Sequence, residues 1–171
     1  MISFNVVAST SEDTVVATYE PSKVRSDSYQ SEAELEKEFI RLLCEQGYTY
    51  LPLHTEDELI ANLRSQLEEL NRYQFSDTEW RQFFSDVIAN PNEHIPEKTR
   101  KIQEDNVQVL HRDDGSSKNI TLIDKKNIHN NRLQVINQYE VKQADGARHD
   151  NRYDVTILVN GFPLVHVELK R

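Results

Sequence analysis

Three charged residues lie within the most apolar region of the chain. Asp154 stands just before the apolar run at 155–158, and Glu168 and Lys170 follow the apolar run at 164–167. Charged groups are seldom buried without a partner, so charges placed among such runs need an explanation. Two carboxylates supply the hard oxygen ligands that Mg²⁺ prefers, and an ammonium group can orient a water and offset charge that develops at phosphorus. This combination of residue types favours phosphodiester hydrolysis.

The two apolar runs predict a β-hairpin around Asn160-Gly161, and its register decides whether the three charges can meet. Glu168 and Lys170 are two residues apart in a strand and therefore project from the same face. A two-residue loop that continued regularly would turn Asp154 away from that face, whereas one extra residue would set Asp154 opposite Glu168. We therefore predict a bulge or a splayed end, for example a three-residue loop with the glycine in the left-handed region.

A structural interpretation of the same residues remains open at this point. Asp154 could cap the start of an edge strand while Glu168 and Lys170 lie on a solvated sheet face. An aspartate, a hairpin and then Glu-x-Lys form a short and common pattern. Spacing alone therefore favours the structural interpretation over the catalytic one.

The first part of the chain carries the signals of helices. Residues 31–46 open with a Ser-x-x-Glu capping box, carry leucine and phenylalanine at helical spacing, and stop at Gly47. The same box recurs at Thr55 and at Ser76, which predicts helices from there to Leu70 and to Ile88. A short fourth helix is expected within residues 96–105.

The second part changes to the period of strands at residues 106–112, 119–124 and 132–141, which predict an antiparallel sheet. Residues 1–30 are predicted to form a polar amino-terminal arm, because 9–30 are polar and aperiodic. The expected organisation is therefore an arm followed by one α/β domain over 31–171, helical over 31–105 and rich in sheet over 106–171.

A helix over 31–46 could add a further carboxylate to the site. With Leu35 at 0° on a helical wheel of about 100° per residue, Glu32 and Glu36 both fall on the apolar stripe that also holds Phe39 and Leu43. Either glutamate could face the charged hairpin. The alternatives are that Glu32 complements the helix dipole in the first turn and that Glu36 lies at the rim of the stripe.

The charge of the chain is unevenly distributed. The 171 residues carry a net charge of −9. Residues 1–105 hold 10 Lys and Arg against 21 Asp and Glu, whereas residues 106–171 hold 10 Lys and Arg against 8 Asp and Glu. The part with the candidate site is therefore slightly basic. Its candidates for contacts with DNA phosphates are Lys125, Lys126, Arg148 and Arg152, for which the alternative is ordinary solvated loop charge.

Composition excludes several other classes of protein. The single cysteine, Cys44, rules out a disulfide framework and a cysteine-based zinc cluster, and the six histidines show no close metal-ligand spacing. No apolar run approaches the ~20 residues that span a bilayer, and the first residues do not have the pattern of a signal peptide. We expect a cytoplasmic protein without membrane partners.

The segment NRYDVTILVNGFPLVHVELKR at 151–171 resembles the nuclease motif of the R subunit of type I restriction-modification enzymes, a PD-(D/E)-x-K nuclease. The resemblance covers nearly the whole chain from Asp27 onward and is therefore far more specific than three charged residues. Further segments resemble the amino-terminal domain of the same subunit in the same order: YQSEAELEKEFIRLLCEQGY at 29–48, KTRKI at 98–102 and LIDKKN at 122–127.

This resemblance implies a restriction-endonuclease-like α/β core with a mixed β-sheet flanked by helices. The catalytic Asp, Glu and Lys of the motif match Asp154, Glu168 and Lys170, and the resemblance implies that the two carboxylates bind Mg²⁺. The sequence departs from the motif at Tyr153, where the motif commonly has proline. PD-(D/E)-x-K nucleases often add a helix carboxylate, and similarity to the SEAELE segment favours Glu36, whereas the wheel favours Glu32.

The resemblance also implies endonucleolytic cleavage of double-stranded DNA in an ATP-dependent complex with methylation and specificity subunits and the rest of the R subunit. ATP would bind outside this chain, which has no G-x-x-x-x-G-K-[ST] loop. Because the chain stops one residue after Lys170, we expect the nuclease domain to be truncated and weakly active or inactive alone. The rival hypothesis is a non-catalytic acidic module that binds proteins.

Overall fold

The computed structural model describes residues 4–9, 15–19, 31–141 and 151–170 of the chain. The chain divides into two compact units, residues 1–30 and 31–171. The first unit contains an antiparallel hairpin of β1 (Phe4–Ser9) and β2 (Val15–Tyr19). These two strands were not predicted from the sequence, although β2 has the sequence VVATY and β-branched and aromatic residues favour strands.

The second unit begins with three helices, α1 (Glu32–Glu45), α2 (Glu56–Asn71) and α3 (Asp77–Phe83), where the sequence predicted them. In each capping box the first side chain accepts a backbone N–H and the glutamate accepts the N–H of the cap residue, which satisfies donors that a helix start leaves unpaired. The predicted boxes are confirmed at Ser31 with Glu34, Thr55 with Glu58, and Ser76 with Glu79.

A π-helical turn over Phe84–Ile88 extends α3, and α4 (Ile95–Gln103) forms close to the predicted fourth helix. Strands β4 (Val107–His111) and β5 (Ser117–Thr121) pair with each other in antiparallel register. They form a separate two-stranded sheet and do not join the third predicted strand.

The main sheet has the strand order β3-β6-β7-β8. Its strands are β3 (Thr49–Tyr50), β6 (Leu133–Val141), β7 (Asn151–Val159) and β8 (Phe162–Val167). Strand β3 runs parallel to β6, and the remaining neighbours are antiparallel, so the sheet is mixed, as expected. A 3-10 turn over Ile128–Asn130 precedes β6.

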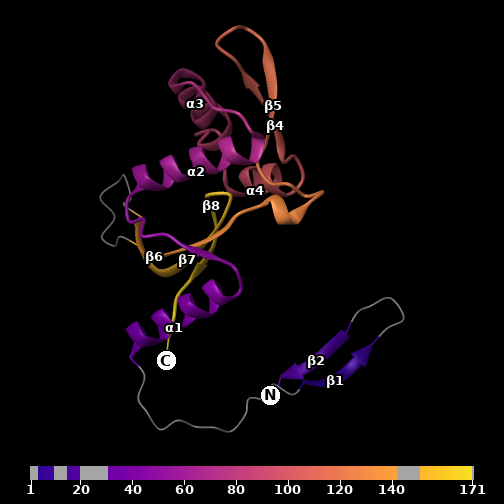
Figure 1. Cartoon of the computed structure of the whole chain (residues 1–171), viewed down its shortest axis with the longest axis vertical. Helices are drawn as coiled ribbons and strands as arrows, with labels where there is room; N and C mark the ends of the chain where they lie inside the picture. Colours follow the sequence, from indigo (N-terminus) through magenta and orange to yellow (C-terminus); the bar gives the residue numbers. More distant parts are fainter. Residues whose placement is uncertain (1–3, 10–14, 20–30, 142–150, 171) are drawn as a thin grey trace. The chain divides into compact units, whose positions relative to one another are not determined.

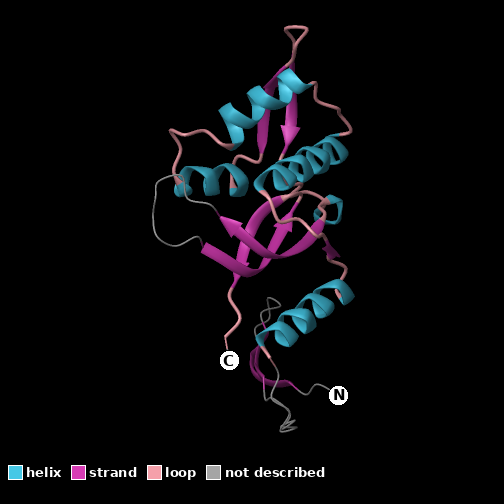
Figure 2. Ribbon diagram, turned by 90° about the vertical axis from the view of Figure 1, so that its left-hand side faces the viewer, coloured by secondary structure: helices cyan, strands magenta, loops and turns pink. Residues whose placement is uncertain are grey.

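Helices α1 and α2 cover opposite faces of this sheet. Both views show β6, β7 and β8 between the two helices (Figure 1, Figure 2). Leu43 of α1 packs with Val135 and Val155 on one face, and Leu59 of α2 packs with Ile136 and Leu158 on the other. Successive residues of β6 thus serve different helices, as the alternation of side chains along a strand requires.

The β4-β5 hairpin is tied to α3 through Glu79, a buried carboxylate. It accepts hydrogen bonds from the Tyr73 hydroxyl at 2.8 Å, the Ser76 N–H at 3.0 Å and the Asp113 N–H at 3.1 Å. Burial acts to raise the pKa of Glu79, but these hydrogen bonds and the charge of Arg112 outweigh burial and hold the pKa below its ordinary value.

Candidate functional site

The β7-β8 hairpin has the irregular register that the site requires. Its turn holds two residues, Asn160 at φ +50° and Gly161 at φ +83°, and pairs Val159 with Phe162. The register then shifts, because Leu164 is an extra residue in β8. The predicted bulge is confirmed, and it lies in β8 rather than in the three-residue loop that served as the example.

The turn stays tight because it lies against α2. A Cβ atom on Gly161 would come within 2.6 Å of the Leu63 Cα atom, which leaves no room for a wider loop. The extra residue is accommodated instead in β8, an edge strand where bulges are common. Pro163, which has no N–H for strand pairing, directly precedes the bulge.

Beyond the bulge, Val155 pairs with Val167, and the same register continued by one residue sets position 154 opposite position 168. The Leu169 N–H donates to Asp154 Oδ2 at 2.7 Å, so this carboxylate is held between the positions of Glu168 and Lys170. The Lys170 Nζ atom lies 3.2 Å from Glu168 Oε2, and the two side chains are 76% and 64% exposed. The structure therefore bonds Asp154 to the backbone between the other two predicted residues, which form an ion pair with each other at an open end of the hairpin.

Of the two helix glutamates, the structure brings Glu36 to the sheet. Its carboxylate accepts hydrogen bonds from the side-chain amides of Asn137, at 2.6 Å, and Gln138 on β6. By register, Gln138 stands across from Asp154. Glu32 is exposed in the first turn of α1, where the helix dipole favours a carboxylate.

Of the candidate phosphate contacts, the structure describes the side chains of the two lysines only. The Lys125 Nζ atom donates to the Gln103 and Glu104 carbonyl oxygens at 3.0 and 3.2 Å and so caps the end of α4. Lys126 is exposed. The side chain of Arg152 and all of Arg148 lie outside the described residues.

The donor set of the hairpin fits a hard divalent cation. Asp154 Oδ1 has no hydrogen-bond donor among the described residues, and the exposed carboxylate of Glu168 has Lys170 as its ion-pair partner. Over residues 31–141 and 151–170, no three His, Cys, Asp or Glu side chains gather closely enough to hold a metal ion. Two carboxylates suit Mg²⁺, which keeps several waters and commonly binds one or two carboxylates together with substrate phosphates.

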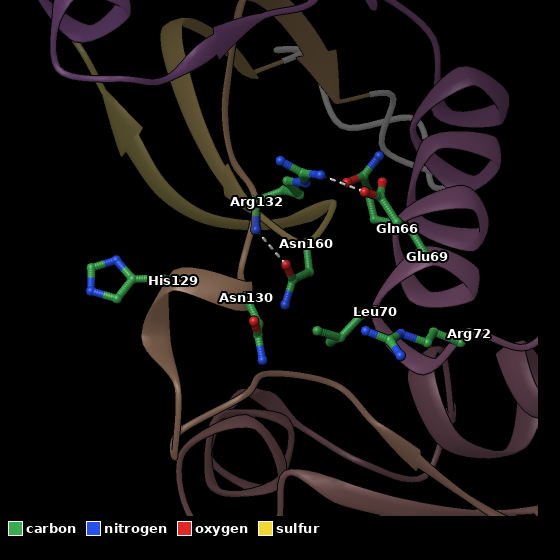
Figure 3. A pocket seen from close by; sticks show the side chains of 8 residues that line it. All are labelled: Gln66, Glu69, Leu70, Arg72, His129, Asn130, Arg132 and Asn160. Carbon is green, nitrogen blue, oxygen red and sulfur yellow. Dashed lines mark hydrogen bonds and ion pairs between the residues drawn. The ribbon is translucent and has the colours of Figure 1, made fainter.

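Sequence reasoning missed a polar pocket of about 330 Å³ beside the turn of the hairpin. Figure 3 shows Arg132 directed toward Glu69 of α2, with which it forms an ion pair at 2.5 Å, and Asn160 directed toward the Arg132 backbone. Asn160 is buried, donates to the Leu122 carbonyl and Asn131 Oδ1 and accepts from the Arg132 N–H. At about 3.3 Å per strand residue, this pocket is roughly 20 Å along β7 from Asp154, so the two sites are separate.

In the described part of the chain, no helix has both the length and the apolar character needed to cross a membrane.

Comparison with known proteins points to one family. The family described as "Type I restriction enzyme R protein N terminus" matches residues 29–171. The chain is 45% identical over 166 residues to the type I restriction enzyme EcoprrI endonuclease subunit of Escherichia coli, covering 96% of this chain and 52% of that protein.

Staphylococcal proteins match over a shorter stretch. The SsaAORF53P endonuclease subunit of Staphylococcus saprophyticus is 35% identical over 148 residues, and the SauMSSORF170P endonuclease subunit of Staphylococcus aureus strain MSSA476 is 36% identical over 149 residues. Each match covers 84% of this chain and 15% of the relative. The chain thus spans about half of the E. coli relative and a smaller share of the staphylococcal ones.

Proposed function

The chain belongs to the family of the amino-terminal region of type I restriction enzyme R proteins, and from this premise we propose that it performs Mg²⁺-dependent endonucleolytic cleavage of double-stranded DNA. The observation that carries the proposal is the shifted register of β7 and β8, which brings Asp154 to the backbone between Glu168 and Lys170. A regular two-residue hairpin would have separated these groups.

Asp154 and Glu168 would hold the divalent cation through their carboxylate oxygens. The cation, when bound, supplies positive charge that stabilises the developing charge on the phosphate oxygens. Lys170 lies 3.2 Å from one proposed ligand, where its ammonium group can orient the attacking water. The water forms the new bond to phosphorus and loses a proton, and the bond from phosphorus to the 3′ oxygen breaks. The leaving 3′ oxygen takes up a proton, so the products carry a 3′-hydroxyl and a 5′-phosphate.

The proposed partners follow from the family and from the charge of the chain. The relatives are endonuclease subunits of type I restriction enzymes, so we propose the methylation and specificity subunits and the rest of an R subunit as partners, with ATP used outside this chain. The net charge of −9 repels phosphates, so basic surfaces of those partners would have to supply most of the attraction to DNA.

The test is DNA cleavage by the reconstituted restriction complex. Asp154→Asn and Lys170→Ala should abolish cleavage and spare ATP hydrolysis, because neither residue belongs to a nucleotide-binding motif. The matched controls are Asp57→Asn and Lys37→Ala, which change exposed residues on α2 and α1 and should cleave normally. Retained cleavage by Asp154→Asn would refute the assignment.

A non-catalytic acidic module remains the second candidate. The ion pair of Glu168 with Lys170 and the hydrogen bond of Asp154 to the Leu169 N–H are contacts that a purely structural hairpin would also make. This candidate predicts that Asp154→Asn lowers the stability of the hairpin and leaves DNA cleavage by the complex unchanged. The same cleavage assay therefore separates the two functions.

A further inference from the structure

His166 lies on the same side of the chain as Glu168, at the end of β8. Val167 and Leu169 pack with the core that faces α1, so the residues that alternate with them project from the opposite face. His166 and Glu168 are both exposed there. Alternate residues of a strand are roughly 7 Å apart, so the His166 side chain is a neighbour of a proposed metal ligand.

Two contacts fix the orientation of the His166 ring. Thr156 pairs with His166 across β7 and β8, and the Thr156 Oγ1 atom lies 3.0 Å from His166 Nδ1. The Tyr153 ring stacks on the imidazole, with the ring centroids 4.1 Å apart and the ring planes 17° from parallel. Tyr153 directly precedes Asp154, so this stacking joins His166 to the segment of β7 that carries the other proposed ligand.

The Thr156 hydroxyl decides which ring nitrogen of His166 carries the proton. Thr156 is fully buried, and among the described residues its hydroxyl has no hydrogen-bond partner other than His166 Nδ1. A proton on Nδ1 would make the ring the donor and leave the hydroxyl proton buried without an acceptor, which is unfavourable. The hydroxyl therefore donates to Nδ1, and the proton of the neutral ring lies on Nε2.

The Nε2–H group is left as an oriented donor beside the proposed metal site. In the segments that the structure describes, Nε2 makes no hydrogen bond or ion pair, and His166 does not form a metal-holding group with two carboxylates. A donor whose ring is already held loses little freedom when it binds a ligand. At a site that binds DNA, the acceptors that meet such donors most often are phosphate oxygens.

We propose that His166 Nε2–H donates a hydrogen bond to a phosphate oxygen of the DNA strand held at the site of Asp154 and Glu168. Thr156 is a positioning residue, which acts through His166 by keeping the proton on Nε2, and Tyr153 fixes the plane of the ring. The inference rests on the proposed nuclease function and deepens it by naming a DNA contact of the same site. A neutral donor can bind phosphate without repelling the cation.

The first measurement is DNA cleavage by the reconstituted restriction complex. His166→Phe removes both ring nitrogens and keeps a ring that can stack on Tyr153. A hydrogen bond to a charged group contributes about tenfold to a hundredfold in binding, so cleavage at subsaturating DNA should slow by about that factor. His166→Gln, whose side-chain amide supplies a donor at a similar distance from the backbone, should cleave clearly faster than His166→Phe.

Two further variants separate this effect from a loss of stability. His166→Phe leaves the buried Thr156 hydroxyl unpaired, and adding Thr156→Val removes that hydroxyl. The double variant should therefore unfold at a higher temperature than His166→Phe and still cleave slowly. His111→Phe is the matched control, because it makes the same change at an exposed residue of β4 in the separate sheet, and it should cleave normally.

The second measurement is the position of the His166 proton, which does not depend on activity. Nitrogen NMR shifts of a histidine-labelled chain distinguish protonated from unprotonated ring nitrogens at about pH 8, above the ordinary histidine pKa. The spectrum of His166→Gln assigns the His166 signals by their absence. We expect a proton on Nε2 and none on Nδ1, and a proton on Nδ1 would overturn the inference.

The cleavage results also separate this inference from the proposed function. If Asp154→Asn abolishes cleavage and His166→Phe leaves it unchanged, the role of His166 is overturned and the proposed function stands. Cleavage by His166→Gln that is no faster than cleavage by His166→Phe would also overturn it, because the donor would then have no effect. If Asp154→Asn cleaves normally, the proposed function and the inference built on it both fail.

Discussion

Replacing Gly161 with alanine should destabilise the domain far more than the same change at Gly115. Both glycines have positive φ, +83° and +80°, so alanine at either position carries the left-handed penalty of about 1 kcal/mol. They differ in their surroundings, because a Cβ on Gly115 meets nothing within 4 Å, whereas a Cβ on Gly161 lies 2.6 Å from the Leu63 Cα atom.

The contact at Gly161 adds a second cost. Carbon atoms pack at about 3.5–4.0 Å, so the turn or α2 must move by roughly 1 Å, and overpacking of this kind costs about 1–3 kcal/mol. The expected loss in unfolding free energy is therefore about 2–4 kcal/mol at Gly161 and about 1 kcal/mol at Gly115. In a domain of this size these losses correspond to roughly 6–12 °C and 3 °C in Tm.

Urea unfolding followed by circular dichroism measures both losses. An unchanged slope of unfolding free energy against urea concentration shows that the substitution does not affect the denatured state. Equal losses for the two variants would refute the argument that close approach of the turn to α2 keeps the loop at two residues. That outcome would also leave the position of the bulge at Leu164 without its physical reason.

Two other substitutions test the packing around the site. Asn160→Ala should lower the unfolding free energy by about 3 kcal/mol, because it leaves buried backbone groups without partners. A loss below about 1 kcal/mol in urea unfolding would show that the hydrogen bonds of Asn160 do not stabilise the fold in this way. Glu79→Gln tests the lowered pKa of Glu79. The charged carboxylate stabilises the fold at pH values above the ordinary glutamate pKa, and this stabilisation is lost as the pH falls through the lowered pKa of the folded state. The stability deficit of this variant should therefore be largest at neutral pH and shrink in acid, and a deficit that grows as the pH falls would show the opposite sign of shift.

The helices were predictable because their signals are local. Ser31, Thr55 and Ser76 each face a glutamate three residues later, and both partners of the capping box lie within one turn. Strand β3 has only two residues, both exposed, and therefore carries no periodic pattern for a sequence to reveal.

The irregular features of the site were only partly predictable. A shifted hairpin register followed from the need to bring Asp154 to Glu168, but the position of the extra residue depends on contact between Gly161 and α2, which are distant in the sequence. The hydrogen bond from Gln138 to Glu36 was not predictable, because Gln138 has a left-handed backbone and glutamine is not a residue type that signals positive φ.

Anomalous diffraction from crystals soaked in Mn²⁺ tests directly whether Asp154 and Glu168 form a divalent-cation site. We expect a peak bonded to carboxylate oxygens of both residues, at about 2.0 to 2.6 Å. An empty hairpin at high Mn²⁺, with the two carboxylates more than about 8 Å apart, would contradict the claim, since oxygens at that separation cannot share one ion.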